Sequence, residues 1–294
     1  MTNELQVYID GKYYPKSEAK ISVYDHGFLY GDGVFEGIRA YNGIVFKLKE
    51  HINRLYRSAH AIMLNVPLTK TELEEAVINT LRKNKMNDSY IRLIVSRGVG
   101  DLGLDPRKCS RASVIIIADT INIKAGNAKE VGITAMFTWV RRNPVDATTH
   151  EIKSLNYLNS ILGKIEANAC GVDEAICIEP NGCVAEGIGE NIFIVKNGAV
   201  LTPPNSTGAL DGITSDVIIG LCEKLNIKIS IANLTPFMIF TADEAFFTGT
   251  AMEVVPIREV NKRVIGDGKP GPVTKVLMDE FQKVIANSQN GIKI

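Results

Sequence analysis

HEIKSLNYLNSILGKIEANA, residues 150–169, is the stretch around which the rest of the chain is organised. Its apolar residues recur at helical spacing and predict one buried helical face, made of Leu158, Ile161, Leu162, Ile165 and Ala169. Lys153 precedes this stripe, where the chain is expected to leave an extended segment. A lysine at the end of an element, beside apolar neighbours, can lose its proton and act as a nucleophile. The alternative for a lysine taken alone is a solvated surface position.

Length and composition describe an ordinary globular protein. The chain has 294 residues, enough for two domains, with 45% hydrophobic and 22% charged residues. Lys+Arg and Asp+Glu both number 33, so the formal net charge is zero. This balance gives no support to a general polyanion binder, and we expect no nucleic-acid partner. It also leaves self-association unopposed, which favours an oligomer.

The cysteines and the N-terminal residues indicate a compartment. Five cysteines, an odd number without any CxxC pair, are interpreted as reduced thiols rather than as disulfides or metal ligands. The first fifteen residues do not resemble a signal peptide, and no apolar run approaches the length of a membrane span. We therefore expect a cytoplasmic protein with no membrane partner and no metal.

The first part of the chain predicts an α+β domain. Asp10-Gly11 and Asn42-Gly43 lie between β-rich runs and are typical of hairpin turns. Two helices are expected next, over 47–64 and 69–84, the first with an apolar side made of Leu48, His51, Ile52, Leu55, Ala59, Ile62 and Met63. Thr69 and Glu72 match a capping box at the start of the second helix. Strands over 89–98 and 114–119 complete the order ββααββ, which predicts a domain over residues 1–121.

A polar segment then interrupts the apolar runs and predicts a connection over residues 122–132. Beyond it, Asn181-Gly182 and Asn197-Gly198 predict two more hairpins. The region 133–294 is therefore expected to form a second domain rich in β-structure.

Two arginines are candidate binding residues. In the strand YIRLIV, Arg92 shares one face with Tyr90 and Ile94, and it is either a residue at the sheet edge or a ligand for a carboxylate. Arg54 lies beside the apolar stripe of the first helix. A partly buried arginine needs an anionic partner, either a carboxylate of the protein or the phosphate of a ligand. Taken alone, Arg54 favours the ion pair within the protein.

Three segments of the second domain could bind an anion and a cofactor. Glu186 follows a strand, among small or flexible residues. The helix that begins near Thr214 would direct free backbone N–H groups at whatever precedes it, and the hydroxyl of Thr250 adds a donor. The alternative is simple capping of that helix by Thr214 and a turn at Gly249.

Taken together and in this order, these segments resemble the fold-type IV pyridoxal-phosphate enzymes, which have the fold of D-amino-acid aminotransferase. Within that fold the chain is most similar to the branched-chain amino-acid aminotransferases. The resemblance runs from about residue 5 to residue 285 and rests on YGDGVFEGIRAY, YIRLIVSRG, IKSLNYL, VAEGIGENIF, GIT and GTA. It implies an α+β protein with a small N-terminal α/β domain and a larger, β-rich, cofactor-binding C-terminal domain.

The resemblance implies pyridoxal 5′-phosphate as the cofactor and a role for each matching residue. Lys153 would form the Schiff base with the cofactor and then transfer the proton of the substrate α-carbon. Glu186 would pair with the pyridine nitrogen, with Glu190 as its rival. The remaining contacts to the phosphate, the phenolic oxygen and the ring would come from Arg54, Ile213, Thr214, Thr250, Tyr157 and Leu210.

The same resemblance implies the substrates. Tyr90 and the N–H of Ala251 would bind the α-carboxylate, Tyr30 and Phe35 would shape the side-chain pocket, and Arg92 would bind the distal carboxylate of 2-oxoglutarate or L-glutamate. The expected reaction is transamination of L-leucine, L-isoleucine and L-valine with 2-oxoglutarate, in at least a homodimer.

One departure and several alternatives stay open. The family usually has arginine directly after GIT, and this chain has Ser215. A D-amino-acid aminotransferase and an aminodeoxychorismate lyase share the fold. A binding or assembly protein without turnover is the alternative of another class, because fold does not fix function.

Overall fold

The computed structural model describes residues 4–120 and 127–294, and these fall into two compact units. The first unit comprises residues up to Asn122 together with Ile152–Asn156 and Ile285–Ile294, and the second comprises Ile123–Glu151 and Tyr157–Val284. Residues 122–126 of the predicted connection lie outside the described residues. The short helix α4 (Ala128–Val131) follows them.

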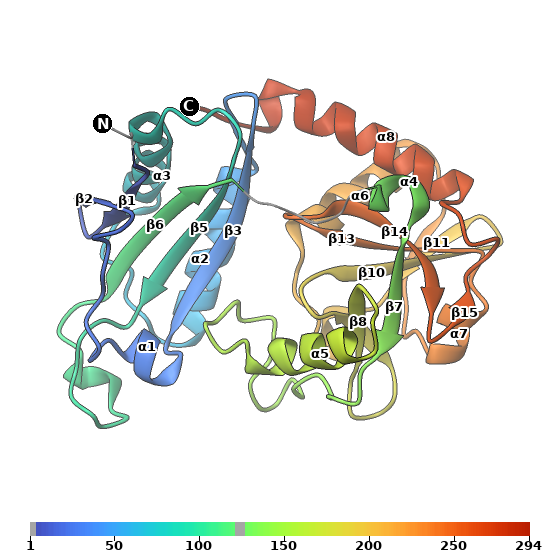
Figure 1. Ribbon diagram of the computed structural model, residues 1–294, viewed down its shortest axis with the longest axis horizontal. Coiled ribbons are helices and arrows are strands. Elements are labelled where there is room, and N and C mark those ends of the chain that lie inside the picture. The colour runs from blue at the N-terminus through green and yellow to red at the C-terminus, as the bar shows by residue number, and fades with distance from the viewer. Residues whose placement is uncertain (1–3, 121–126) are drawn as a thin grey trace. The chain divides into compact units, whose positions relative to one another are not determined.

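The first unit is built on a seven-stranded sheet in which every neighbouring pair is antiparallel. Helix α2 packs on strand β3, and α3 packs on β1 and β6 (Figure 1). In sheet order the strands are β16 (Gly291–Lys293), β4 (Ile44–Phe46), β3 (Gly33–Tyr41), β5 (Ser89–Ser96), β6 (Ser113–Asp119), β1 (Gln6–Ile9) and β2 (Lys12–Pro15). The helices are α1 (His26–Tyr30), α2 (Leu48–Ala61) and α3 (Lys70–Asn84).

Local sequence signals account for most of these elements. Asp10 and Asn42 adopt positive φ angles of 49° each and close the hairpins β1–β2 and β3–β4, as predicted. Thr69 and Glu72 form the predicted capping box of α3. Met63 was expected on the apolar side of α2 but is 89% exposed. The helix has ended at Ala61, and Met63 has a positive φ of 52°, so the helical period no longer sets its direction.

The second unit holds a nine-stranded mixed sheet. In order, its strands are β12 (Ile229–Ile231), β11 (Ala199–Thr202), β10 (Asn191–Lys196), β13 (Glu244–Gly249), β14 (Glu253–Val260), β7 (Ile133–Phe137), β8 (Glu174–Ile178) and β9 (Val184–Gly187), with β15 (Arg263–Val264) paired to β14. Besides α4, its helices are α5 (Leu158–Ala169), α6 (Ile213–Lys224), α7 (Pro236–Phe240) and α8 (Pro272–Ala286), the last of which runs into the first unit. The predicted α+β class is confirmed.

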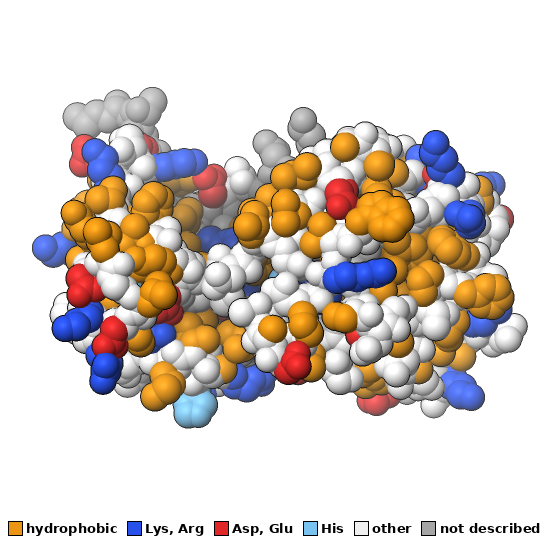
Figure 2. Space-filling view, turned by 90° about the horizontal axis from the view of Figure 1, so that it is seen from below, with side chains coloured by type: hydrophobic (Ala, Val, Ile, Leu, Met, Phe, Trp, Pro, Cys, Tyr) orange, Lys and Arg blue, Asp and Glu red, His pale blue; other side chains and the backbone are white. Residues whose placement is uncertain are grey.

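The prediction of a buried apolar face on the helix after Lys153 is wrong. On α5, the side chains of Leu158, Ile161, Leu162 and Ile165 are 66%, 52%, 42% and 57% exposed, and Ala169 is exposed as well. The helix buries its small residues instead, namely Ser160, Gly163 and Ala167. Figure 2 views the molecule from the side where α5 lies in Figure 1 and shows many hydrophobic side chains on that face. The helical period was predicted correctly, but periodicity does not tell which side of a helix meets the core.

Candidate active site

The segment that carries Lys153 is held against β3. The N–H of Lys153 donates to the hydroxyl of Ser58 at 3.1 Å, and its carbonyl accepts from the N–H of Phe35 at 3.0 Å. Two residues on, the N–H of Leu155 donates to the carbonyl of Gly33 at 2.9 Å. The ammonium nitrogen lies 4.7 Å from the centre of the Phe35 ring. Lys153 therefore precedes the helix α5, as predicted, but it lies among turns and bends, with a single bridge between Ser154 and Val34, and not in an extended segment.

Lys153 shares its surroundings with three of the predicted substrate residues. Phe35 on β3 and Tyr90 and Arg92 on β5 lie on one face of the sheet, because Gly37 pairs with Arg92 in the antiparallel register. The guanidinium carbon of Arg92 lies 4.5 Å from the centre of the Phe35 ring, and its Nη2 donates to the Tyr90 hydroxyl at 3.2 Å. A Cβ at Gly37 would lie 2.1 Å from the Tyr90 hydroxyl, so glycine makes room for this arrangement.

Tyr30 lies on α1 in the same unit. Its hydroxyl donates to the carbonyl of Leu102 at 2.5 Å, and its ring meets that of His26 edge-on at 5.1 Å. The side chain therefore anchors the loop that follows β5.

Arg54 makes the ion pair that its sequence context favoured. Its Nε and Nη2 each donate to a different carboxylate oxygen of Glu36, both at 2.7 Å, and His51 Nδ1 lies 2.7 Å from the same carboxylate. Glu36 is fully buried, and burial raises its pKa, but Arg54 and His51 outweigh that effect and lower the pKa to about 2. Sequence reasoning missed Glu36, although a carboxylate in an otherwise apolar strand is a signal that a buried cation lies nearby.

In the second unit, Glu186 lies within β9, one residue before its end, and not after a strand as predicted. Both of its carboxylate oxygens are engaged. Oε2 accepts from the N–H of Leu210 at 2.9 Å, and Oε1 lies 3.3 Å from Nη2 of Arg142. Leu210 is held on its other side, because its carbonyl accepts from the amide of Asn191 at 2.9 Å. Two of the predicted cofactor residues, Glu186 and Leu210, are thus brought into direct contact.

Arg142 is a second residue that sequence reasoning did not place. Its side chain is completely buried, and its guanidinium donates to the carbonyl of Gly187 at 2.6 Å, to Asn159 at 3.0 Å and to Ser160 at 3.2 Å. Nε has no hydrogen-bond partner among the described residues. Arg141 next to it is exposed, and no spacing rule in the sequence distinguishes the two.

The helix α6 begins with an anion-binding geometry. Its N-cap is Gly212, and among the described residues no side chain caps the helix. Thr214 is the second helical residue and is buried, so the alternative that Thr214 caps the helix is wrong. A Cβ at Gly212 would lie 1.8 Å from Oδ1 of Asn191, which explains the glycine. The first N–H groups of the helix, including those of Ile213 and Thr214, are therefore left for a ligand or water.

The turn between β13 and β14 carries Thr250 and Ala251, both partly exposed. Asn191, which contacts the loop before α6, pairs with Thr248 at the end of β13. Gly249 lies against the side chain of Glu190. The loops that carry Glu186, Leu210 to Thr214 and Thr250 therefore meet around Asn191.

Glu190 has a different environment from Glu186. Burial and the neighbouring carboxylate of Glu174 raise the pKa of Glu190 to about 8. Its Oε2 accepts from the N–H of Gly189 at 3.2 Å. Tyr157 lies just before α5 and meets the ring of His150 edge-on at 6.1 Å.

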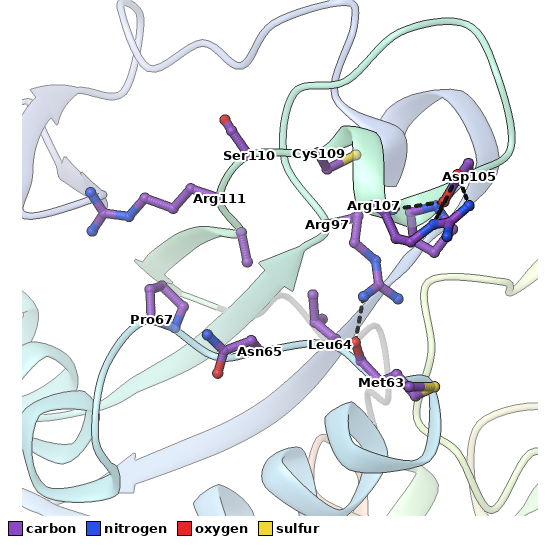
Figure 3. Close-up of a pocket in the computed structure, with 12 residues that line it drawn as sticks. Met63, Leu64, Asn65, Pro67, Arg97, Asp105, Arg107, Cys109, Ser110 and Arg111 are labelled. Atoms are coloured by element: carbon purple, nitrogen blue, oxygen red, sulfur yellow. Dashed lines mark hydrogen bonds and ion pairs between the residues drawn. The ribbon is translucent and has the colours of Figure 1, made fainter.

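A separate pocket of about 510 Å³ lies in the first unit (Figure 3). It is lined by Arg97 and by residues from the segments 63–67 and 105–112, none of which is a predicted site residue. Arg97 is paired with Asp32 and also donates to the carbonyl of Met63, and Arg107 is paired with Asp105. Because the guanidinium groups of Arg97 and Arg107, two of the three arginines that line the pocket, are paired within the protein, we assign this pocket no ligand.

Within residues 4–120 and 127–294, no helix is long and apolar enough to cross a membrane. The same residues contain no group of three or more His, Cys, Asp or Glu side chains suited to a metal ion.

Comparison with known proteins identifies the class. Residues 33–260 match the amino-transferase class IV model, and the chain belongs to this family of aminotransferases. A putative branched-chain-amino-acid aminotransferase of Methanocaldococcus jannaschii is 51% identical over 290 residues, 99% of each chain. The branched-chain-amino-acid aminotransferase of Escherichia coli is 38% identical over 94% of this chain and 91% of its own. The resemblance predicted from the sequence is confirmed.

Solved structures agree with this classification. The Escherichia coli branched-chain amino acid aminotransferase superposes with a TM-score of 0.93 at 36% identity, covering 95% of this chain and 94% of its own. The branched-chain aminotransferase of Thermoproteus uzoniensis with norvaline has a TM-score of 0.90 at 40% identity, covering 96% and 94%. A branched-chain amino acid aminotransferase from T.th., solved with N-(5′-phosphopyridoxyl)-L-glutamate, has a TM-score of 0.90 at 35% identity, covering 95% and 93%. The two-domain fold-type IV architecture is therefore confirmed.

Proposed function

We propose that this protein transfers the amino group of L-leucine, L-isoleucine and L-valine to 2-oxoglutarate, giving branched-chain 2-oxo acids and L-glutamate, with pyridoxal 5′-phosphate as its cofactor. The observation that carries the proposal is the grouping of Lys153 with Phe35, Tyr90 and Arg92 on one face of β3 and β5. A nucleophilic amine, an apolar ring and a guanidinium are the groups that this pair of substrates requires. The names of the relatives point the same way.

The residues fit the cofactor. A phosphorylated pyridine needs an anion site and a carboxylate for its ring nitrogen. The uncapped start of α6, built around Gly212, fits the first need, and the buried carboxylate of Glu186 fits the second. When bound, pyridoxal phosphate supplies the electron sink that makes the α-hydrogen of an amino acid acidic.

Lys153 would bind the cofactor covalently and, once displaced by the substrate amine, move the proton between the substrate α-carbon and C4′ of the cofactor. The hydrogen bonds with Ser58 and Phe35 hold the backbone of Lys153 in one place. For this role the freed amine must be neutral.

Glu186 would accept a hydrogen bond from the protonated pyridine nitrogen and so keep that nitrogen protonated. Nη2 of Arg142 lies 3.3 Å from Oε1, and the N–H of Leu210 donates to Oε2, so both oxygens of this buried carboxylate meet donors. Glu190 has a carboxylate neighbour instead, and its raised pKa favours a neutral acid. This difference supports Glu186 over Glu190.

The phosphate would be held by the N–H groups of Ile213 and Thr214, by the hydroxyls of Thr214 and Thr250, and by Arg54. Tyr157 would donate to the phenolic oxygen, and Leu210 would cover the ring. The α-carboxylate would be bound by Tyr90 and by the N–H of Ala251.

Arg92 would accommodate both substrates in one pocket. Its guanidinium stacks on Phe35, which is an arrangement that leaves N–H groups at the edge for a distal carboxylate. With a branched-chain substrate, the ring of Phe35 and the stem of Arg92 present apolar surface. Tyr30 would help to shape this pocket, because its hydroxyl anchors the loop that follows β5.

The visible absorption of the purified protein tests the function. L-Leucine should convert the band of the lysine-bound cofactor to that of the pyridoxamine form, and 2-oxoglutarate should restore it, while D-alanine has no effect. Lys153→Ala should fold but lose this interconversion. Conversion by D-alanine alone would identify a D-amino-acid aminotransferase. Failure to bind the cofactor at all would favour a binding or assembly protein.

We further propose a cytoplasmic homodimer or larger homo-oligomer. The five cysteines are free thiols, which supports a reducing compartment. The exposed apolar stripe of α5 supports self-association, because such a surface is costly in water. The mass of the protein in solution tests the assembly.

A further inference from the structure

Glu36 is an acidic residue that points into the core of the first unit, between β3 and α2. Its side chain is completely buried, and those of His51 and Arg54 are nearly so, with exposures of 1% and 4%. Two nitrogens of Arg54 and one of His51 converge on its two oxygens, all at 2.7 Å. A carboxylate that meets three nitrogens in this way fixes the plane and direction of the guanidinium.

Arg54 donates to the Glu36 carboxylate through two nitrogens, Nε and Nη2. These two bonds fix the plane of the guanidinium and, with it, the direction of Nη1. Because the guanidinium is planar and rigid, an acceptor that meets Nη1 is recognised along a single direction.

The same pair of elements also fixes Lys153. On α2, Arg54 and Ser58 are one turn apart, and Ser58 accepts from the N–H of Lys153. On β3, Phe35 next to Glu36 donates to the carbonyl of Lys153. The ion pair that orients Arg54 and the hydrogen bonds that hold the backbone of Lys153 are therefore made by neighbouring residues of the same two elements, β3 and α2.

We infer that Glu36 is a positioning residue for cofactor binding. Its carboxylate orients Arg54 so that the guanidinium meets the 5′-phosphate in one geometry, at a fixed place relative to Lys153. This inference rests on the proposed function, in which Arg54 binds the phosphate. It concerns position rather than charge, since the negative charge of Glu36 by itself opposes the binding of a phosphate.

Glu36→Gln and Glu36→Asp separate position from charge. The side chain of glutamine has one acceptor oxygen and an NH₂ group. It therefore cannot accept the hydrogen bonds from Nε and Nη2 of Arg54 together with the one from His51. Aspartate keeps the charge but withdraws the carboxylate by one methylene. If Glu36 acts through position, both variants should misplace Arg54.

The readout is the preference for the phosphate, measured as the ratio of the dissociation constants of pyridoxal and pyridoxal 5′-phosphate for the apo form of the full chain. Both variants should lower this ratio by about tenfold or more, because a displacement of about 1 Å is enough for such a loss. Arg54→Met should lower it similarly, and adding Glu36→Gln to Arg54→Met should lower it no further.

Asp32→Asn provides the matched control, because Asp32 forms a similar two-branched pair with Arg97 in the same unit. It should change thermal stability but leave the ratio unchanged. An unchanged or higher ratio in Glu36→Gln, or a normal ratio in Glu36→Asp, would overturn the inference. Failure of the parent protein to bind pyridoxal 5′-phosphate would instead show that the proposed function is wrong.

Discussion

Arg142 and Glu186 form a buried ion pair, with 3.3 Å between Nη2 and Oε1, at the end of β9. The two residues are distant in the sequence, and neither has an exposed charge. Arg142 also donates to the carbonyl of Gly187, the residue after Glu186, so it holds both the side chain and the local backbone of the carboxylate.

Replacing Arg142 by Met should destabilise the protein by about 3–5 kcal/mol, since it leaves the buried carboxylate of Glu186 without its cation. The carboxylate of Glu186 should then be misplaced, and the bound cofactor should lose part of its band from the ring-protonated form. Urea unfolding and absorption spectra measure the two effects. Arg142→Lys should recover part of both. If Arg142→Met has the stability and the absorption spectrum of the parent, the ion pair is dispensable.

Arg92→Met should separate the two half-reactions. The rate with L-glutamate should fall by about ten- to a hundredfold, because a charged hydrogen bond to the distal carboxylate is lost. The rate with L-leucine should stay within about threefold of the parent, since methionine keeps an apolar stem of similar length at this position. Single-turnover kinetics with each donor measure both. Equal losses for the two donors would place Arg92 outside the recognition of the distal carboxylate.

Glu190 should make the stability of the protein depend on pH. Its pKa is raised to about 8 in the folded state from a usual value of 4.5, so between these values the folded state binds a proton that the unfolded state does not. Its contribution to stability is therefore fully present below about pH 4.5 and is lost as the pH rises to about 8. In thermal unfolding experiments from pH 5 to 9, the melting temperature of Glu190→Gln should increase relative to that of the parent as the pH rises. A constant difference across this range would contradict the shift.

The apolar stripe of α5 should be an interface between copies of the chain. Substituting Glu for both Leu158 and Ile165, which are 66% and 57% exposed, would place two charges in that interface. Light scattering after size exclusion should then report a smaller assembly than the parent. Phe237→Glu on α7 is the control, because this residue is 72% exposed but lies on another helix. Dissociation by the control alone would place the interface elsewhere.

Much of the local structure could be predicted from the sequence. The turns at Asp10-Gly11 and Asn42-Gly43, the capping box at Thr69 and the alternation along β5 depend on neighbours a few residues away. The site residues follow the same rule: features set by neighbouring residues could be predicted, and contacts between distant segments could not. The start of α6 near Thr214 was recognisable, whereas the partners of Arg54 and Glu186 were not, because those contacts join segments distant in sequence.

The sequence by itself determined the class of the protein, because its motifs occur in a fixed order along the chain. It also determined the period of α5 and the alternation of β3, since these follow from backbone geometry. Only the tertiary structure decided that the apolar side of α5 is exposed and that Glu36 and Arg142 are the partners of Arg54 and Glu186. Burial and ion pairing depend on which segments meet in space, and periodicity along one segment carries no information about its neighbours.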